Sequence, residues 1–316
     1  MDIVACFDKG YVMPTSVMMF SVCDNNRDED IIFHLVVDES VSSDAKNRLK
    51  ELIHDFPRVR IEFYLINSEL TKKYSFEHGD RLTRSTYYRL FLAEILPESI
   101  KKVIYLDGDC IIRHSLRSLW NTDLTGYAIA AAFDACEGMI EFYNRLHYPS
   151  YIGYFNAGVL LINLDYWRQH HISKAFVEYC NVHPNRIKLE DQDVLNAVLK
   201  DCKLSIPVKY NFQTLFFKEK HLWDENTHGV EFMEALYDPT IVHFSSKSKP
   251  WDAYIRYSHP YSNTFYKYQN QTMWKGSRVE RRSKKTRIKN SIGDNLRRVK
   301  ILTLKKSGFI NISQID

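Results

Sequence analysis

The sequence predicts an α/β protein built on a doubly wound, mainly parallel sheet. From the first residue, strand-like apolar runs alternate with helix-like runs, the pattern of strands joined by crossover helices. One run, residues 103–106, is uninterruptedly apolar and partly β-branched, like a parallel strand buried on both faces. With 316 residues, 45% of them hydrophobic and 26% charged, the chain can build one large domain or two smaller ones.

The expected elements follow the chain in order. Strands should lie at residues 3–7, 31–37, 59–66 and 102–106. Helices should lie at residues 14–23, 44–55 and 85–96; Leu49, Leu52 and Ile53 have helical spacing in the second, and Pro97 ends the third. After residue 106 the alternation loosens, and we expect strands at 128–133, 157–162 and 240–244 and helices at 165–180 and 193–200.

The cysteines and the apolar segments indicate a cytoplasmic protein. The six cysteines include no C-x-x-C pair, and several lie in apolar segments, as free thiols do in a reducing compartment. The N-terminus lacks a basic region followed by a long apolar stretch. No window approaches the roughly 20 apolar residues that cross a bilayer.

The C-terminal part has a different composition. From about Tyr261 the chain becomes polar and aromatic and then basic. Residues 275–306 hold 13 lysines and arginines against Glu280 and Asp294, although the net charge of the whole chain is +4. An acidic body with a basic tail points to a polyanionic surface as the partner of the tail. We therefore expect a folded domain over residues 1–260 and an aromatic and basic extension over residues 261–316.

Two carboxylates follow the fourth expected strand. Asp107 and Asp109 are spaced i, i+2, so an extended chain puts both on one face, where they can grip one divalent cation. Gly108 between them lets a ligand approach the backbone closely. Ligands of doubly wound sheets bind beyond the carboxyl ends of strands. The pattern is short, and a solvated acidic loop is the alternative.

The end of the first expected strand is a candidate nucleotide site. Asp8, Gly10 and Tyr11 offer a hydrogen-bonding carboxylate, a close backbone approach and an aromatic ring for a base. A capped turn is the alternative. The sequence contains neither G-x-G-x-x-G nor G-x-x-x-x-G-K-[ST], which argues against dinucleotide and P-loop sites.

Three further segments carry polar groups near expected element ends. Arg89 shares a helical face with Ser85 near a helix start, which suits anions, unless it is a surface arginine. Asn156 offers a donor and an acceptor to a sugar hydroxyl, unless its segment is only a tight turn. Residues 190–193, three acids and an amide, simply complement a helix dipole unless Asp191 and Gln192 face the Asp107–Asp109 pair.

His243 follows the last expected strand and precedes hydroxyls and two lysines. Such a segment suits a diphosphate, although a lone histidine at a strand end is usually structural. An imidazole added to two carboxylates shifts the preferred cation, because Mn²⁺ tolerates mixed oxygen and nitrogen ligands whereas Mg²⁺ favours oxygen.

Together, these motifs resemble the family 8 glycosyltransferases, above all the bacterial lipopolysaccharide and lipooligosaccharide α-galactosyl- and α-glucosyltransferases. The resemblance runs from Met1 to about Trp251, and its most specific stretches are residues 105–109, 155–163, 191–193 and 243–251. It implies a GT-A fold, a catalytic domain over residues 1–260, and retaining transfer of galactose or glucose from a UDP-sugar to a glycan. Synthesis of lipopolysaccharide or another cell-surface polysaccharide would be the setting.

The resemblance also implies roles for matching residues. Asp107, Asp109 and His243 would bind Mn²⁺, with Mg²⁺ as the alternative. Asp191, Gln192 and Asp134 would act near the transferred hexose and the acceptor. The implied donor-binding set is Phe7, Asp8, Lys9, Gly10, Tyr11, Arg89, Asp107, Gly108, Asn156, Ala157, Asp191, Gln192, Ser246 and Lys249.

The chain departs from the family pattern at two places. Ser246 stands where the family usually has glycine, which puts close backbone approach to the diphosphate in doubt. Lys9 and Gly10 replace a more polar pair in the turn that would contact uridine.

The resemblance bears on mechanism as well. Retention ordinarily uses a carboxylate nucleophile on the opposite face of the sugar, but Gln192 occupies the matching position. We therefore expect a front-face reaction in which Gln192 stabilises an oxocarbenium-like transition state, with Asp191 as the alternative, a covalent nucleophile. A UDP-sugar-binding protein with little turnover and an Asp-x-Asp phosphatase are the other functions to weigh.

The resemblance implies a glycan acceptor that is lipid-linked. Residues 275–306 would then dock on anionic lipid at the inner face of the cell membrane, making the protein peripheral. The rings of Tyr261, Phe265, Tyr266, Tyr268 and Trp274 would lie in the interface. A disordered, solvated tail is the alternative, and no motif supports nucleic-acid binding.

Overall fold

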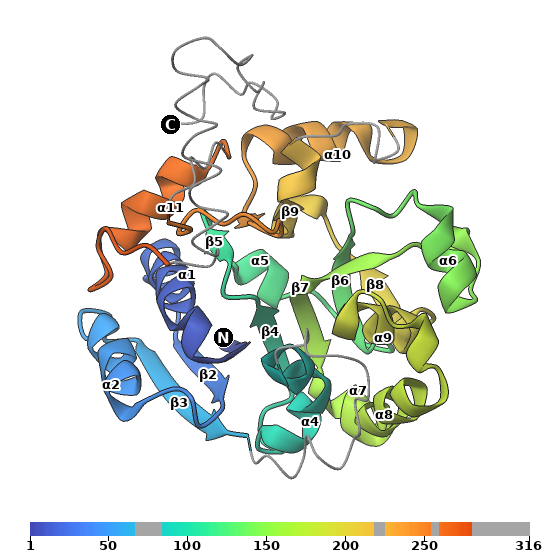
Figure 1. Cartoon of the computed structure of the whole chain (residues 1–316), viewed down its shortest axis with the longest axis horizontal. Coiled ribbons are helices and arrows are strands. Elements are labelled where there is room, and N and C mark those ends of the chain that lie inside the picture. Colours follow the sequence, from blue (N-terminus) through green and yellow to red (C-terminus); the bar gives the residue numbers. More distant parts are fainter. Residues whose placement is uncertain (67–83, 218–224, 254–258, 280–316) are drawn as a thin grey trace, which may run out of the picture.

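A seven-stranded mixed sheet runs through the centre of the computed structural model, which describes residues 1–66, 84–217, 225–253 and 259–279 (Figure 1). The strand order is β3-β2-β1-β4-β7-β6-β8. Neighbouring strands run parallel except where β7 pairs with β4 and with β6. The expected doubly wound, mainly parallel sheet is confirmed.

The first half of the sheet agrees closely with the expected elements. It contains β1 (Asp2–Phe7), β2 (Ile31–Val37), β3 (Val59–Leu65) and β4 (Lys102–Leu106). Residues on β1 alternate between two cores: Ile3 and Ala5 pack towards α1 (Val12–Asn25) and α2 (Ser43–Leu52), whereas Val4 packs on the other face. This two-residue period is what covering both faces of a sheet with helices requires.

The second half contains β6 (Ile129–Phe133), β7 (Phe155–Asn163) and the edge strand β8 (Lys203–Ser205). The expected helix at 165–180 is two helices, α7 (Leu164–Gln169) and α8 (Ile172–Val182), because His171 adopts a left-handed φ of 51° between them. They pack with α9 (Glu190–Leu199) on one face of the sheet. Two short helices, α5 (Arg117–Trp120) and α6 (Ile140–Leu146), lie in connections.

The helix expected at 85–96 begins as a 3₁₀ helix, η2 (Arg84–Phe91), and only α4 (Leu92–Ile95) is α-helical. Side chains three residues apart line up in a 3₁₀ helix, so Thr86 and Arg89 share one side. The Arg89 side chain also donates to the carbonyl oxygen of Thr86, at 3.3 Å.

A second sheet, in the order β5-β10-β9, forms beyond the end of β4. Its strands β5 (Cys110–Ile112), β9 (Phe212–Gln213) and β10 (Ile241–His243) have only two or three residues, too few for a periodic pattern, and only β10 was expected. An aromatic core packs beside this sheet and includes residues of α10 (Glu225–Tyr237), which the sequence analysis missed.

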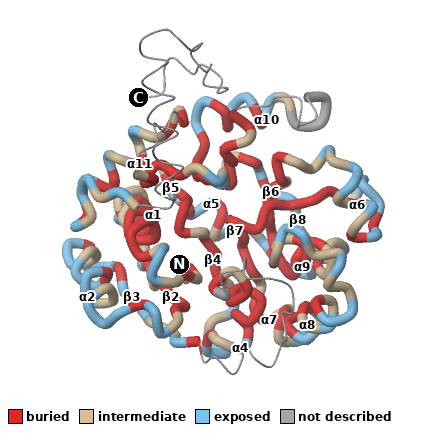
Figure 2. Tube along the Cα trace, in the orientation of Figure 1, coloured by how far each residue is buried: buried red, intermediate tan, exposed pale blue. Residues whose placement is uncertain are grey.

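The aromatic segment after residue 260 belongs to the fold, so the expectation that its rings lie outside the core was wrong. Helix α11 (Ser262–Gln269) packs against α1, and Tyr261, Phe265 and Tyr268 are buried in the aromatic core (Figure 2). The Tyr268 hydroxyl accepts a hydrogen bond from Asn25 Nδ2 at 2.7 Å. These buried rings are not available to a membrane interface. Most of the basic segment, residues 280–306, lies outside the described residues.

The strand order creates one place for a ligand. It reverses at β1, which pairs with β2 on one side and β4 on the other, so the carboxyl ends of β1 and β4 flank a crevice. Asp8 follows β1 and Asp107 follows β4. Among the described residues, no helix combines the length and apolar character needed to cross a membrane.

Candidate functional site

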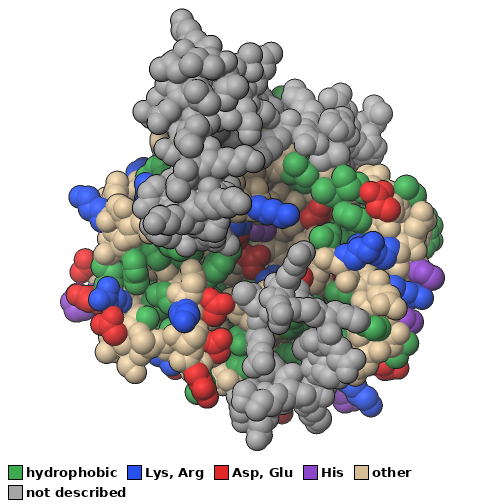
Figure 3. All heavy atoms as spheres, viewed as in Figure 1, with side chains coloured by type: hydrophobic (Ala, Val, Ile, Leu, Met, Phe, Trp, Pro, Cys, Tyr) green, Lys and Arg blue, Asp and Glu red, His purple; other side chains and the backbone are tan. Residues whose placement is uncertain are grey.

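A cavity of about 700 Å³ opens at the carboxyl ends of β1 and β4. The space-filling view shows a hollow near the centre of this face (Figure 3). Predicted site residues that line the cavity are Phe7, Tyr11, Arg89, Asp107, Gly108, Asp109, Asp134, Asn156, Ala157, Asp191, Gln192, His243 and Ser246. Asp8, Lys9, Gly10 and Lys249 are not among the described residues that line it.

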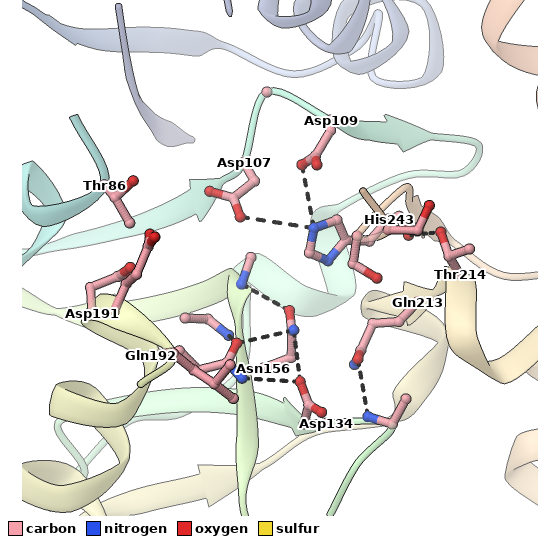
Figure 4. A pocket seen from close by; sticks show the side chains of 18 of the residues that line it. Thr86, Asp107, Asp109, Asp134, Asn156, Asp191, Gln192, Gln213, Thr214 and His243 are labelled. Atoms are coloured by element: carbon pink, nitrogen blue, oxygen red, sulfur yellow. Dashed lines mark hydrogen bonds and ion pairs between the residues drawn. The ribbon is translucent and has the colours of Figure 1, made fainter. Parts of the chain in front are cut away.

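Asp107, Asp109 and His243 converge, as the sequence predicted (Figure 4). His243 Nε2 lies 3.3 Å from Asp109 Oδ1 and 3.8 Å from Asp107 Oδ2. The antiparallel pairing of β10 with β5 places His243 opposite Cys110, next to Asp109. Two carboxylate oxygens and one imidazole nitrogen that point at one another fit a divalent cation that accepts mixed ligands, such as Mn²⁺.

Cys110 is a neighbour of this set that the sequence did not reveal. Potential ligand atoms of Asp109, Cys110 and His243 all lie within 4.8 Å of one another. No motif pointed to the thiol, because only the strand pairing brings it opposite His243.

Asp109 is kept ionised by its surroundings. It is buried, and burial alone would raise its pKa, but Lys249 and His243 outweigh that effect and hold the pKa below its usual range. Lys249 Nζ donates to Asp109 Oδ2 and to the carbonyl oxygen of Phe244. Lys247, two residues before Lys249 in the chain, lines the cavity, whereas Lys249 is not among its lining residues.

Two glycines make room for protein groups rather than for a ligand alone. A Cβ on Gly108 would lie 2.4 Å from Thr15 Oγ1 on α1, so Gly108 permits close packing of this helix. A Cβ on Gly158 would lie 2.2 Å from His243 Cε1, because the imidazole packs directly on the β7 backbone. Gly158 therefore sets the position of the histidine.

Arg89 joins the two acidic parts of the site. Its Nη2 lies 2.9 Å from Asp107 Oδ1, and its Nε lies 2.9 Å from Asp191 Oδ2. Nη1 donates to the Ala157 carbonyl oxygen at 2.7 Å, and the guanidinium carbon lies 4.3 Å from the centre of the Tyr105 ring. Arg89 is thus a buried arginine between carboxylates, and Asp191 does face the Asp107 side of the cavity.

One guanidinium shared by two carboxylates leaves a negative charge uncompensated. Burial, opposed by Arg89 and reinforced by the charge of Asp107, raises the pKa of Asp191 to about 7. The two carboxylates raise the pKa of Arg89 despite its burial, so the guanidinium stays charged.

The hexose-site candidates form a second cluster, built on β7. Gln192 Oε1 accepts from the backbone N–H of Ala157 at 3.0 Å and from Asn156 Nδ2 at 3.1 Å. Gln192 Nε2 donates to Asp134 Oδ2 at 3.1 Å, and Asn156 Nδ2 donates to the same oxygen at 2.9 Å. The amide of Gln192 therefore has a fixed orientation.

The acids of residues 190–193 divide between site and scaffold. Asp193 is fully buried and accepts from both terminal nitrogens of Arg145, from the Tyr154 hydroxyl, and from the backbone N–H groups of Lys188 and Leu189. This carboxylate holds the start of α9 in place, a structural role. Asp191 and Gln192 can consequently project into the cavity.

The turn after β1 is capped, as one interpretation of the sequence had it. Asp8 Oδ1 accepts from the backbone N–H of Gly10 at 2.7 Å and caps the short 3₁₀ helix η1 (Lys9–Tyr11). Phe7 and Tyr11 on either side line the cavity, so the proposed base contacts stay a prediction.

Several other lining residues had no signal in the sequence. They come from α6, from β9 and the 3₁₀ helix after it, and from the segment just before α9, and only the tertiary fold brings them together. They include Phe142, Lys188, Leu189, Gln213, Thr214 and Leu215.

We predict that Gly158→Ala weakens Mn²⁺ binding at least about tenfold, the lower range for disturbing groups that orient ligands, because the new Cβ displaces His243. Calorimetric titration with Mn²⁺ measures the affinity. Gly229→Ala is the matched control: an added Cβ there meets no atom within 4 Å. Equal affinities of wild type and Gly158→Ala would contradict this view of the histidine.

We also predict a pH-dependent stability from Asp191. A raised carboxyl pKa means that the folded protein binds the proton more tightly than the unfolded chain, so the stabilising contribution is full below about pH 4 and lost as pH rises through about 7. Relative to Asp191→Asn, the free energy of unfolding of wild type should fall across this window, as measured by urea denaturation. Substitution of the exposed Asp201 by Asn serves as the control. If the difference in free energy of unfolding between wild type and Asp191→Asn does not change with pH, the pKa of Asp191 is not raised.

Comparison with known proteins agrees with this site. Residues 2–254 match the model of "Glycosyl transferase family 8". The chain is 30% identical over 280 residues to General stress protein A of Bacillus subtilis, covering 87% of this chain and 94% of that protein. It is 29% identical over 274 residues to the lipopolysaccharide 1,3-galactosyltransferase of Salmonella typhimurium, covering 84% and 77% of the two chains.

A solved structure supports the same relationship. The galactosyltransferase LgtC, crystallised with donor and acceptor sugar analogues, superimposes with a TM-score of 0.74 at 25% identity, covering 86% of this chain and 96% of that one. The likeness confirms the GT-A fold. The chain therefore belongs to glycosyltransferase family 8 and is a hexosyltransferase, as its motifs had implied.

Proposed function

We propose that the protein transfers galactose or glucose from a UDP-sugar to a glycan acceptor, with a divalent cation and with retention of anomeric configuration. The observation that carries the proposal is one cavity that contains both a convergent Asp107, Asp109 and His243 set and the fixed amide of Gln192. The relatives named as a lipopolysaccharide galactosyltransferase and as LgtC with sugar analogues support the substrate class.

The residues present suit Mn²⁺, with Mg²⁺ as the less favoured alternative because of the imidazole. Asp107, Asp109 and His243 would hold the cation, which when bound offsets charge that develops on the leaving diphosphate. Arg89 keeps Asp107 in position through the 2.9 Å contact. Lys247 and Ser246 line the same end of the cavity and would contact the diphosphate, with Lys249 supporting Asp109.

The hexose would lie against Gln192, Asn156 and Asp134. An amide is a poor nucleophile, and Asp191 is held 2.9 Å from the Arg89 guanidinium, which lowers its reactivity. A front-face reaction follows, in which the leaving phosphate takes the proton of the acceptor hydroxyl. Gln192, fixed by three hydrogen bonds, presents its dipole to the developing positive charge on the sugar.

The acceptor side is proposed from the residues between α6 and α9. Phe142 offers an aromatic face and Lys188 a cation to a sugar chain, and both line the cavity. A lipid-linked acceptor on the inner face of the membrane, approached through residues 275–306, remains part of this proposal. Because the rings of α11 are buried, membrane docking by the described part of this segment, up to residue 279, would rest on its basic side chains.

The alternatives have less in their favour. In Asp-x-Asp phosphatases the aspartates normally follow the first strand, whereas Asp107 and Asp109 follow β4. A UDP-sugar-binding protein with little turnover would need no fixed amide at the proposed hexose position, whereas the Gln192 amide is fixed by the backbone N–H of Ala157.

The proposal is tested by measuring UDP release from UDP-galactose and UDP-glucose with Mn²⁺, with and without glycan acceptors. We expect release from one of the two donors, abolished by EDTA and restored by Mn²⁺. Tight donor binding without release would favour the binding protein. Phosphate release from a monoester, with no response to UDP-sugars, would favour the phosphatase.

The same assay tests the amide. Gln192→Ala should lower kcat about 10²-fold, the effect of losing one preorganised electrostatic group, while donor binding changes less. The exposed Gln169→Ala on α7 is the control and should keep wild-type turnover. Turnover of Gln192→Ala equal to that of the control would remove Gln192 from the mechanism.

A further inference from the structure

The imidazole of His243 can serve a cation only in one of its two neutral forms. His243 Nε2 faces Asp107 and Asp109, so when a cation is bound between them this nitrogen must carry the lone pair and Nδ1 the proton. His243 Nδ1 lies 2.9 Å from Asn211 Oδ1. What fixes the form is therefore the orientation of the Asn211 amide, since an amide oxygen only accepts and an amide nitrogen only donates.

A backbone group settles that orientation. The N–H of Gly158 donates to Asn156 Oδ1 at 3.0 Å. Because a backbone N–H can only donate a hydrogen bond, the amide atom of Asn156 that faces it must be the oxygen. The same oxygen accepts from Asn211 Nδ2 at 2.9 Å. The nitrogen of Asn211 is thus directed at Asn156, and its oxygen is left for His243.

The other end of the line agrees. Asn156 Nδ2 donates to Asp134 Oδ2, a carboxylate oxygen, and to Gln192 Oε1. Reversing any amide in the line would set oxygen against oxygen or nitrogen against nitrogen. The groups are buried, with Asn211 at 0% and His243 at 4% exposure, so water does not readily replace a lost partner.

We propose that Asn211 is a positioning residue that fixes the Nδ1–H form of His243, at the end of a line running from Asp134 through Asn156. The inference rests on the cation site of the proposed function. Its consequence is that the side chains around the hexose position and those around the cation share one hydrogen-bonded network through Asn156. Asn211 belongs to no motif identified in the sequence, so its role is inferred from the geometry alone.

The test uses the metal-free full chain with ¹⁵N-labelled histidine at about pH 8. Long-range ¹H–¹⁵N spectra show which of the two ring nitrogens carries a proton, and His243→Gln identifies the signal. Mn²⁺ affinity is then measured by titration followed by electron paramagnetic resonance. The variants are Asn211→Leu, which removes both amide contacts, and Asn211→Asp, which keeps an oxygen for Nδ1–H.

Asn196→Leu is the matched control, because Asn196 is equally buried and bonds only to the β7 and α9 backbone in the contacts described for its side chain. We expect a proton on His243 Nδ1 in wild type, Asn211→Asp and Asn196→Leu. Asn211→Leu should lose it and bind Mn²⁺ about 10–100-fold more weakly, the range for removing a group that orients a ligand.

A metal-free wild type that carries a proton on His243 Nε2 but none on Nδ1 would overturn the inference. The inference would also be overturned if the Asn211→Leu variant kept the proton on His243 Nδ1 and bound Mn²⁺ with wild-type affinity. If the wild type shows the Nδ1–H form but binds no Mn²⁺, the orientation by Asn211 stands and the cation site of the proposed function fails. The two ideas are therefore separated by one set of samples.

Discussion

The site depends on three consecutive residues of the central strand β7, Asn156, Ala157 and Gly158. The Gly158 carbonyl oxygen accepts from the backbone N–H of Asp107 at 2.8 Å, and the Ala157 carbonyl oxygen accepts from Arg89. The Ala157 N–H holds Gln192, and the missing side chain of Gly158 makes space for the imidazole of His243. A buried strand, paired on both sides, thus acts as a rigid template for residues from distant parts of the chain.

Electrostatics explains why such a template suits a cation. Among Asp107, Asp109 and Asp191, three buried or half-buried carboxylates share two cations, Arg89 and Lys249. Burial raises the pKa of Asp191, and the negative charge of Asp107 raises it further. A divalent cation bound here would supply the missing positive charge where the proposed leaving group develops negative charge. The burial of excess negative charge therefore accounts for the perturbed pKa and suits the proposed chemistry.

The sequence predicts those features of the structure that depend on local residue patterns. The first four strands and the Asp107–Asp109 pair could be predicted, because apolar runs mark buried strands and strand ends mark ligand sites. The convergence of His243 with the pair was implied by the resemblance to the family. Strands of two or three residues have no period to read, and the 3₁₀ start of the helix at Arg89 depends on tertiary contacts. The rings after residue 260 look like an extension by composition, yet they fill a core made by α1 and the second sheet. Asn211 could not be found at all, since its importance comes from the orientation of neighbouring amides.

The central claim is that His243 Nε2, held against β7, is a ligand of a cation shared with Asp107 and Asp109. Pulsed electron paramagnetic resonance of the Mn²⁺-loaded protein, labelled with ¹⁵N only in histidine, tests it directly. The account predicts a hyperfine coupling from one directly coordinated imidazole nitrogen that disappears in His243→Gln. Bound Mn²⁺ without any ¹⁵N coupling, or with a coupling that survives this substitution, would contradict it.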